Sequence, residues 1–408
     1  MELNIATPLL GGLSPAAFMQ RHWQKKPLLV RQAWPGVRPP LARPALFELA
    51  RRAGVESRLV EQHPTQGWLV RNGPLRRLAL PPLSRNGWTL LVQGLDLHVP
   101  AAHEMLSRFR FVPDARLDDL MVSWASDQGG VGPHIDSYDV FLLQVQGRRR
   151  WRIGKVDKPL LRADAPLKLL RDFEPTDDWL LEPGDMLYLP PGWGHDGAAE
   201  GGDCMTCSIG FRAPAADTLT RELLLRLADQ AEEGGTGSPA LYRDPRQPAT
   251  ATPAQLPAPL LAFAERALQD LLDDPQALPR ALGEVLSEPK ANVWFEARPT
   301  SRGEGAADAT GDVTLAAATR MLYDTHHVFI NGEAFVAGGR DAELMRKLAD
   351  CRVLNRADRR RLSKGAAELL SGWVDAGWAH TAQTHSNQAL ADQARAASEG
   401  RAHDRTSR

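Results

Sequence analysis

A glycine-rich loop that leads into a β-rich segment constrains this chain more than any other feature. The loop is Gly129–Gly132, and His134 and Asp136 follow it two positions apart. Side chains at positions i and i+2 of a strand lie on the same face of a sheet. An imidazole and a carboxylate on one face are two of the three groups in the facial triad that binds Fe(II). The alternative is an ordinary polar pair at a strand edge, so the prediction depends on a third ligand.

A second motif supplies a candidate for that ligand. Residues 182–194 have the pattern of a turn, a short apolar strand and a corner rich in Pro and Gly, after which His195 enters the next strand. Gly and Pro at such places are typical of the corners of β-barrels. Because a corner carries the chain onto a neighbouring strand, His195 can return to the earlier pair. The combination predicts a metal site made of His134, Asp136 and His195.

These motifs and three other segments resemble those of the JmjC-type oxygenases. The other segments are residues 22–31, 117–123 and 208–212, which read HWQKKPLLVR, LDDLMVS and SIGFR. Within that family the chain is similar to the bacterial ribosomal oxygenases, which hydroxylate an arginine of a large-subunit ribosomal protein. The resemblance implies an α+β fold, with N-terminal helices and a double-stranded β-helix (cupin) barrel. It also implies Fe(II) as the metal, with 2-oxoglutarate and dioxygen as co-substrates.

The far carboxylate of 2-oxoglutarate needs a cation, and residues 147–153 offer four arginines. Trp151 and Ile153 are apolar and are expected to face the barrel interior. Arg149 shares their parity along the strand, whereas the other three arginines share the opposite parity and are expected to meet solvent. The resemblance also places the family's co-substrate cation at Arg149. A guanidinium binds a carboxylate well because it offers two parallel hydrogen bonds.

Four further residues are weaker candidates for the same site. Ser123 and Ser208 lie on strands that flank the metal motifs, and their hydroxyls are candidate donors to 2-oxoglutarate; the alternative is that they are ordinary strand serines. Asp127 lies in the loop beside the metal and is a candidate partner for a substrate guanidinium, although a local turn bond would also explain it. Tyr138 continues the face of His134 and Asp136, so we expect it to line the substrate mouth.

Composition sets outer limits on the class of protein. The chain has 408 residues, of which 43% are hydrophobic, with 49 basic and 50 acidic side chains and three cysteines. We therefore expect a soluble protein of two or three domains in a reducing cytoplasm, with no membrane segment. Two tempting metal motifs, Cys204-x-x-Cys207 and the pair His326 and His327, are interpreted as core or solvated residues because their spacing splits them between the two faces of a strand.

The resemblance and the sequence pattern together divide the chain into four parts. We expect a catalytic domain at 1–212, a helical dimerisation region at 213–290, a winged-helix-like domain at 291–387 and a disordered tail at 388–408. In the second part, residues 260–272 form a wide apolar stripe, for which the alternative is that it covers one face of the barrel. In the third, Asn331-Gly332 predicts a hairpin turn. Residues 291–380 hold 12 basic and 12 acidic side chains, which argues against direct DNA binding.

The leading hypothesis is therefore a 2-oxoglutarate-dependent hydroxylase that acts on a ribosomal-protein arginine and forms a homodimer. Other hypotheses are hydroxylation of a ribosomal-protein histidine, a cupin dioxygenase that acts on a small molecule without 2-oxoglutarate, and a non-catalytic module that keeps only the fold. Arg149 argues against the cupin dioxygenase that does not use 2-oxoglutarate. Its presence together with a complete triad argues against the non-catalytic module.

Overall fold

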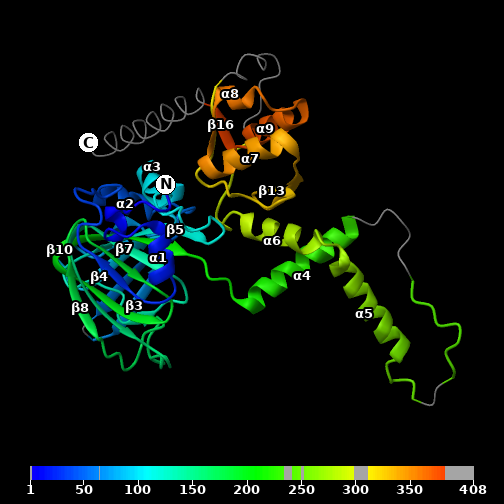
Figure 1. Ribbon diagram of the computed structural model, residues 1–408. Helices are drawn as coiled ribbons and strands as arrows, with labels where there is room; N and C mark the ends of the chain where they lie inside the picture. The colour runs from blue at the N-terminus through cyan, green and yellow to red at the C-terminus, as the bar shows by residue number, and fades with distance from the viewer. Residues whose placement is uncertain (1, 64, 234–240, 250–251, 298–310, 382–408) are drawn as a thin grey trace, which may run out of the picture. The chain divides into compact units, whose positions relative to one another are not determined.

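The computed structural model describes residues 2–63, 65–233, 241–249, 252–297 and 311–381. The tail expected at 388–408 lies outside these residues. The chain forms two compact units, 1–213 and 214–408, each of which is described by itself (Figure 1). Among the described residues, every helix is too short or too polar to span a membrane.

The first unit is built on one antiparallel sheet of ten strands with short helices beside it (Figure 1). Its helices are α1 (Pro15–Arg21), α2 (Arg43–Leu49) and α3 (Pro100–Ser107), with 3-10 turns at Pro8–Leu10, Arg77–Ala79 and Leu95–Leu97. Its strands are β1 (Leu28–Val30), β2 (Ser57–His63), β3 (Gly67–Asn72), β4 (Trp88–Val92), β5 (Leu117–Ala125), β6 (His134–Ile135), β7 (Val140–Lys155), β8 (Asp177–Leu181), β9 (Met186–Leu189) and β10 (Trp193–Phe211).

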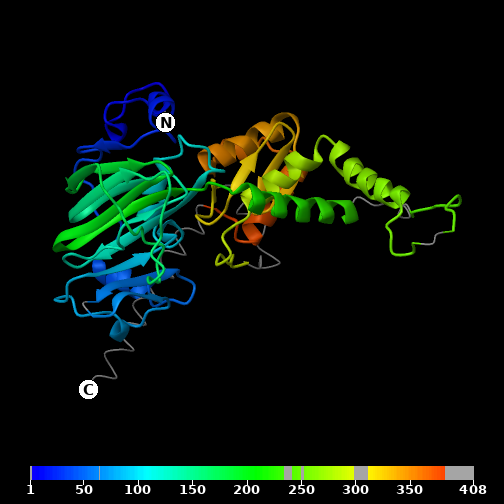
Figure 2. The same ribbon diagram turned by 90° about the horizontal axis from the view of Figure 1, so that it is seen from below.

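The two longest strands, β7 and β10, hold this sheet together. The strand order is β1-β9-β7-β10-β5-β4-β2-β3, with β6 on β10 and β8 on β7. One end of β7 pairs with β9 and the other end pairs with β8, so β7 serves two neighbours along its length. Figure 2 shows the long arrows of this unit running side by side. Residues of β2, β4, β5, β7 and β10 line one cavity, which means that the sheet curves around it.

An aromatic cluster fixes the N-terminal segment against the sheet. The ring of Phe18 lies 4.9 Å from that of Tyr188, and the ring of Trp23 lies 5.1 Å from that of Phe211. Helix α1, which carries Phe18, starts at Pro15, because the Ser14 hydroxyl accepts a hydrogen bond from the Ala17 N–H and proline suits the first helical position. Phe18, Tyr188 and Phe211 are fully buried and Trp23 is partly buried, so the cluster belongs to the core of this unit.

The second unit contains helices and two small three-stranded sheets. Its helices are α4 (Ala216–Glu233), α5 (Ala258–Asp273), α6 (Ala277–Ser287), α7 (Gly339–Cys351), α8 (Arg356–Arg359) and α9 (Lys364–Asp375). Its strands are β11 (Val313–Leu315), β12 (Met321–Tyr323), β13 (His327–Ile330), β14 (Glu333–Val336), β15 (Val353–Leu354) and β16 (Ala379–Thr381). The sheets have the orders β15-β11-β16 and β12-β13-β14, and α7 and α9 pack on a shared apolar core.

The predicted hairpin is present between β13 and β14. Asn331 and Gly332 both have positive φ, at 49° and 89°, as a two-residue turn of this kind requires. The apolar stripe predicted at 260–272 is also helical and forms most of α5. Helix α5 buries none of its side chains among the described residues, whereas α4 and α6 share a small core of Leu227, Ala277 and Ala281.

Candidate metal centre

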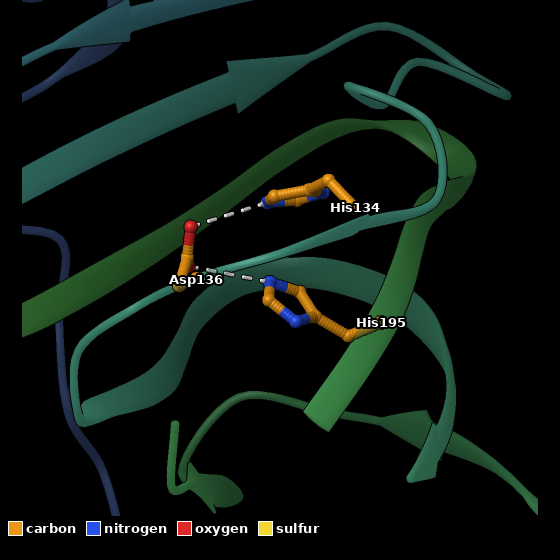
Figure 3. A group of neighbouring side chains, drawn as sticks. All are labelled: His134, Asp136 and His195. Carbon is orange, nitrogen blue, oxygen red and sulfur yellow. Dashed lines mark ion pairs between the residues drawn. The ribbon is translucent and has the colours of Figure 1, made fainter. Parts of the chain in front are cut away.

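Three side chains from two distant segments of the chain point toward one another (Figure 3). The Nε2 atom of His195 lies 3.5 Å from Oδ2 of Asp136, and Nε2 of His134 lies 4.0 Å from Oδ1 of the same carboxylate. One donor atom from each residue lies within 4.8 Å of the other two, which is the spacing that a shared metal ion needs. The predicted triad is therefore brought together by the fold.

The backbone pairing explains why the two histidines meet. Strand β6 has only two residues, so Asp136 lies just beyond it rather than within a longer strand. His134 is nonetheless the direct antiparallel partner of His195 on β10, and their rings lie 4.2 Å apart. Cross-strand partners have neighbouring side chains on one face of a sheet. The Pro and Gly corner before β10 thus delivers His195 as the sequence predicted.

Hydrogen bonds orient both rings for metal binding. The Nδ1–H of His134 donates to the Gly132 carbonyl at 2.9 Å, and the Nδ1–H of His195 donates to the Trp193 carbonyl at 3.1 Å. Each bond to a carbonyl requires the proton on Nδ1, which leaves the lone pair of Nε2 directed at Asp136. Metal-binding histidines commonly have their second nitrogen held in this way.

Burial keeps the site ready for a cation. Burial lowers the pKa of His195 to about 3, with a further contribution from the imidazole of His134, so His195 is neutral at pH 7. Burial raises the pKa of the Asp136 carboxyl, while His134 and the Tyr138 hydroxyl oppose that rise. Two imidazoles, of which His195 is neutral, beside a partly desolvated carboxylate are a donor set that suits a divalent transition metal.

The glycine loop is required because the backbone packs too closely for side chains. A Cβ atom added at Gly130 would overlap with the Gly197 carbonyl oxygen, and one at Gly129 would overlap with the Trp88 carbonyl oxygen. Both contacts are to backbone, which cannot move aside cheaply. The loop therefore has to be glycine at these two positions to bring β6 against β10.

The triad opens into a cavity of about 490 Å³ inside the first unit. Arg149 lines this cavity and is only 4% exposed, whereas its neighbour Arg148 is exposed, as the parity of the strand predicted. Within the described part of the chain, the Nε and Nη2 atoms of Arg149 have no hydrogen-bond partner. A buried guanidinium without a partner is costly, so an anion in this cavity would relieve the cost.

Three of the four weaker candidates also line the cavity. Ser123 on β5, Ser208 on β10 and Tyr138 beyond β6 are among its walls. Asp127 is not. Its Oδ1 atom accepts a hydrogen bond of 2.8 Å from the Gly201 N–H. This bond joins the segment just before the glycine loop to β10.

Sequence reasoning missed the part of the cavity that the N-terminal strands provide. Arg58 and Val60 of β2, Thr89 and Leu91 of β4, and Gln93 just after β4 face the same space as the triad. Asp118 and Asp119 of β5 line it as well. Alternation along β2 predicts which of its residues share a face, but not that this face meets a metal site more than seventy positions later. No local signal could have found that contact.

The other motifs that looked like metal sites have the ordinary roles expected of them. Cys204 and Cys207 are both fully buried in β10. His327 is buried and its Nδ1 lies 3.3 Å from Oδ2 of Asp324, while His326 is exposed. Across the described ranges of the chain, the triad is the one group of three or more such side chains with metal-binding spacing.

Comparison with known proteins agrees with the motifs and with the geometry. Residues 104–219 match the model of the JmjC domain, and residues 270–380 match that of the ROXA-like winged helix. The ribosomal protein uL16 3-hydroxylase of Escherichia coli strain K12 is 40% identical over 279 residues, which cover 66% of this chain and 70% of that protein. A probable ribosomal oxygenase of Haemophilus influenzae is 36% identical over 210 residues, which cover 51% of this chain and 52% of that protein.

Solved structures extend the likeness to almost the whole fold. The structure of YcfD, a ribosomal oxygenase from Escherichia coli in complex with cobalt and 2-oxoglutarate, matches with a TM-score of 0.75 at 31% identity. The match covers 91% of this chain and 98% of that one. Sequence, winged-helix unit and metal-site geometry therefore agree, and the chain belongs to the JmjC ribosomal oxygenase family.

Proposed function

We propose that this protein is an Fe(II)- and 2-oxoglutarate-dependent oxygenase that hydroxylates an arginine side chain of the large-subunit ribosomal protein uL16. The observation that carries the proposal is that the His134, Asp136 and His195 triad and the unpartnered guanidinium of Arg149 share one cavity. A metal alone would explain the triad, and an anionic co-substrate would explain the buried cation beside it.

Each residue of the cavity has a distinct proposed role. His134, Asp136 and His195 hold the metal through two Nε2 atoms and one carboxylate, which leaves positions open for other ligands. Arg149 binds the far carboxylate of 2-oxoglutarate through paired hydrogen bonds, and the hydroxyls of Ser123 and Ser208 donate to the same molecule. Bound iron with 2-oxoglutarate and dioxygen supplies the oxidative chemistry, and the chain supplies binding, orientation and exclusion of water.

The acidic side of the cavity supports a cationic substrate. Burial raises the pKa of Tyr138, and the nearby carboxylates of Asp136, Asp119 and Asp118 raise it further. The negative potential that holds the Tyr138 proton would also favour a guanidinium over a neutral side chain. Tyr138 therefore lines the proposed path of the substrate arginine. A direct contact of Asp127 with the substrate stays a prediction. The local hydrogen bond from the Gly201 N–H to its carboxylate is the competing explanation for this residue.

We further propose that the protein works in the cytoplasm as a homodimer assembled through residues 213–290. Helix α5 exposes Leu260, Leu261, Leu268 and Leu272, with exposed fractions between 37% and 62%. A row of exposed leucines on one helix is typical of a protein interface. In this scheme the double-stranded β-helix occupies residues 1–212, and a winged-helix-like domain occupies 291–387.

The test is a mass-spectrometric comparison of ribosomal proteins from cells with and without this chain. We expect one large-subunit protein to gain the mass of one oxygen atom on an arginine, and cells that carry His134→Ala to lack the gain. The variant His326→Ala, which changes an exposed histidine outside the cavity, is the matched control and should retain it. A gain on histidine would redirect the proposal to the histidyl-hydroxylase alternative. The absence of any gain, with 2-oxoglutarate-independent turnover of a small molecule, would refute it.

A further inference from the structure

The second unit separates its charges, although its total charge is balanced. Residues 352–364 carry six basic side chains and one acidic one, whereas the rest of 291–380 carries six basic and eleven acidic ones. The basic segment contains α8, the turn after it and the first residue of α9. Helix α8, a turn and α9 follow one another as the two helices of a helix-turn-helix do. The net charge of residues 291–380, which argued against DNA binding, is therefore zero although one part of this region is strongly basic.

Most of the basic side chains on this surface point to solvent. Arg356 and Arg360 are exposed, and within the described part of the unit no carboxylate or carbonyl is paired with either guanidinium. They lie four positions apart, and the Arg360 N–H donates to the Arg356 carbonyl, so they share one helical face. The side chain of Lys364 is 92% exposed and that of Arg361 is 57% exposed. Arg352 differs, because its guanidinium donates to the carbonyls of Ala316 and Thr319.

The neighbouring carboxylates are committed to other groups. Asp358 is buried, accepts an ion pair from Lys347 and another at 3.3 Å from Arg361, and so is neutralised twice. The carboxylates of Asp312 and Asp341 accept backbone N–H groups, from Arg356 and Ser363 respectively. Glu368 reaches Lys364 at 3.7 Å, between two largely exposed side chains, which is a weak pairing. These carboxylates therefore stabilise the turn between α8 and α9, and the guanidinium groups of Arg356 and Arg360 stay available to an anion from outside the chain.

The exposed face of α9 indicates what kind of polyanion would fit. Besides Lys364 and Glu368, which pair weakly with each other, the exposed positions there are all small, namely Gly365, Ala367, Ser371 and Gly372. Bases in the grooves of a duplex are read by long side chains such as Arg, Asn and Gln, and this face has none of these. Small residues beside a row of arginines allow close approach to a phosphate backbone without reading its sequence.

We propose that α8 and the start of α9 form a surface that binds structured RNA through its phosphate backbone. The binding itself follows from the charges and exposures above. The choice of RNA rests on the proposed function, because a ribosomal-protein substrate is met in the company of ribosomal RNA. The surface would then hold the enzyme near its substrate without contacting the hydroxylated residue.

Fluorescence anisotropy with the full chain and a labelled RNA hairpin tests this proposal. At about 50 mM salt we expect micromolar binding that weakens steeply as salt rises, as phosphate contacts require. The double variant Arg356→Glu with Arg360→Glu should bind at least about tenfold more weakly, and its plot of log affinity against log salt should be shallower by about two. Arg356→Gln with Arg360→Gln, which only removes charge, should show a smaller loss in the same direction.

Two controls separate this surface from general charge and from catalysis. Arg76→Glu with Arg77→Glu makes the same change of net charge at exposed positions of the first unit and should bind RNA like the unaltered protein. Hydroxylation of an isolated substrate peptide should be unchanged in the α8 variants, so failure of the proposed catalytic function would be seen separately. Equal loss in both double variants, equal affinity for a DNA hairpin, or preference for an acidic polypeptide over RNA would each overturn the proposal.

Discussion

Arg149 shows how one position in a strand acquires a role that its neighbours cannot have. It lies between Arg148 and Arg150 in a segment with four arginines, and composition alone cannot distinguish one of these arginines from another. The pleat turns Arg149 into the cavity, where its guanidinium lies 5.7 Å from the ring centre of Trp151. The pleat turns Arg150 outward, where it pairs with Asp178 and Glu200. The parity of apolar neighbours was therefore sufficient to predict which arginine faces inward.

Replacing this arginine should separate co-substrate binding from folding. In Arg149→Ala we expect the apparent KM for 2-oxoglutarate to rise about 100-fold, because two charge-assisted hydrogen bonds are worth about 3 kcal/mol together. Arg148→Ala is the matched control, since it removes the same side chain from the opposite face of β7. Steady-state kinetics with varied 2-oxoglutarate measures both. An unchanged KM in Arg149→Ala would assign the role to another cation.

Asp185 is a second residue whose surroundings lead to a measurable effect. Burial raises the pKa of its carboxyl, but hydrogen bonds from the Gln32 N–H, the Arg31 guanidinium and the Glu182 N–H outweigh burial, and the net pKa is lowered. A lowered folded pKa means that the stabilisation is complete above the unfolded value near 3.9 and is lost as pH falls through the folded value.

The corresponding prediction concerns the stability of the first unit. At pH 7, Asp185→Asn should lower the free energy of unfolding by about 1–2 kcal/mol. The difference from the unaltered protein should shrink as pH falls below about 4, because the unfolded aspartate then takes up a proton and the folded one follows at lower pH. Asp157→Asn is the control, since that side chain is 81% exposed. Urea unfolding at pH 7 and at pH 3 measures the effect, and a difference that persists undiminished at pH 3 would contradict the assignment.

At the scale of elements, the metal loop depends on how closely two backbone segments approach. Sequence reasoning placed the loop and the corner correctly, because Gly and Pro mark such places. It expected a longer strand through Asp136 and Tyr138, whereas β6 ends at Ile135. Pairing with β10 sets that length, and pairing between distant segments is not encoded in the local pattern.

The close approach makes a prediction about the loop. Gly130→Ala should destabilise the first unit by about 1–3 kcal/mol, since the added methyl group would overlap with the Gly197 carbonyl and one of the two segments would have to move. It should also lower metal affinity, because β6 and β10 carry the two histidines. Gly54→Ala is the control, since a methyl group there meets no atom within 4 Å. Thermal unfolding and metal titration measure both effects, and equal behaviour of the two variants would contradict the packing argument.

At the scale of the whole molecule, the sequence predicted the domains of the chain better than it predicted the surfaces that those domains form. The family resemblance led to the catalytic and winged-helix regions, and the apolar stripe at 260–272 led to α5. The walls that β2 and β4 give to the cavity could not be predicted, because they depend on how the sheet curves. The basic surface of α8 could not be predicted from net charge, because a sum over residues carries no information about where the charges lie.

The exposed leucines of α5 give a prediction about assembly. Leu261→Glu with Leu268→Glu places two charges seven positions apart on one face of the helix and should convert the proposed dimer to a monomer. Leu78→Glu, at a fully exposed position in the first unit, is the control and should remain dimeric. Light scattering at micromolar concentration measures the mass. A dimer that survives the double substitution would place the interface on another surface.

The direct pairing of His134 with His195 has a consequence for how the enzyme acquires its metal. Amide-to-carbonyl bonds between β6 and β10, rather than the ion, set the separation of the two imidazoles. The empty pocket should therefore already have nearly the shape of the filled one, and a chelator should strip the ion without melting the domain. Circular dichroism before and after treatment with EDTA should be superimposable, and added Fe(II) should restore turnover at the rate of simple diffusion and binding. The domain would then fold without its metal ion, and the ion could be removed and bound again without unfolding.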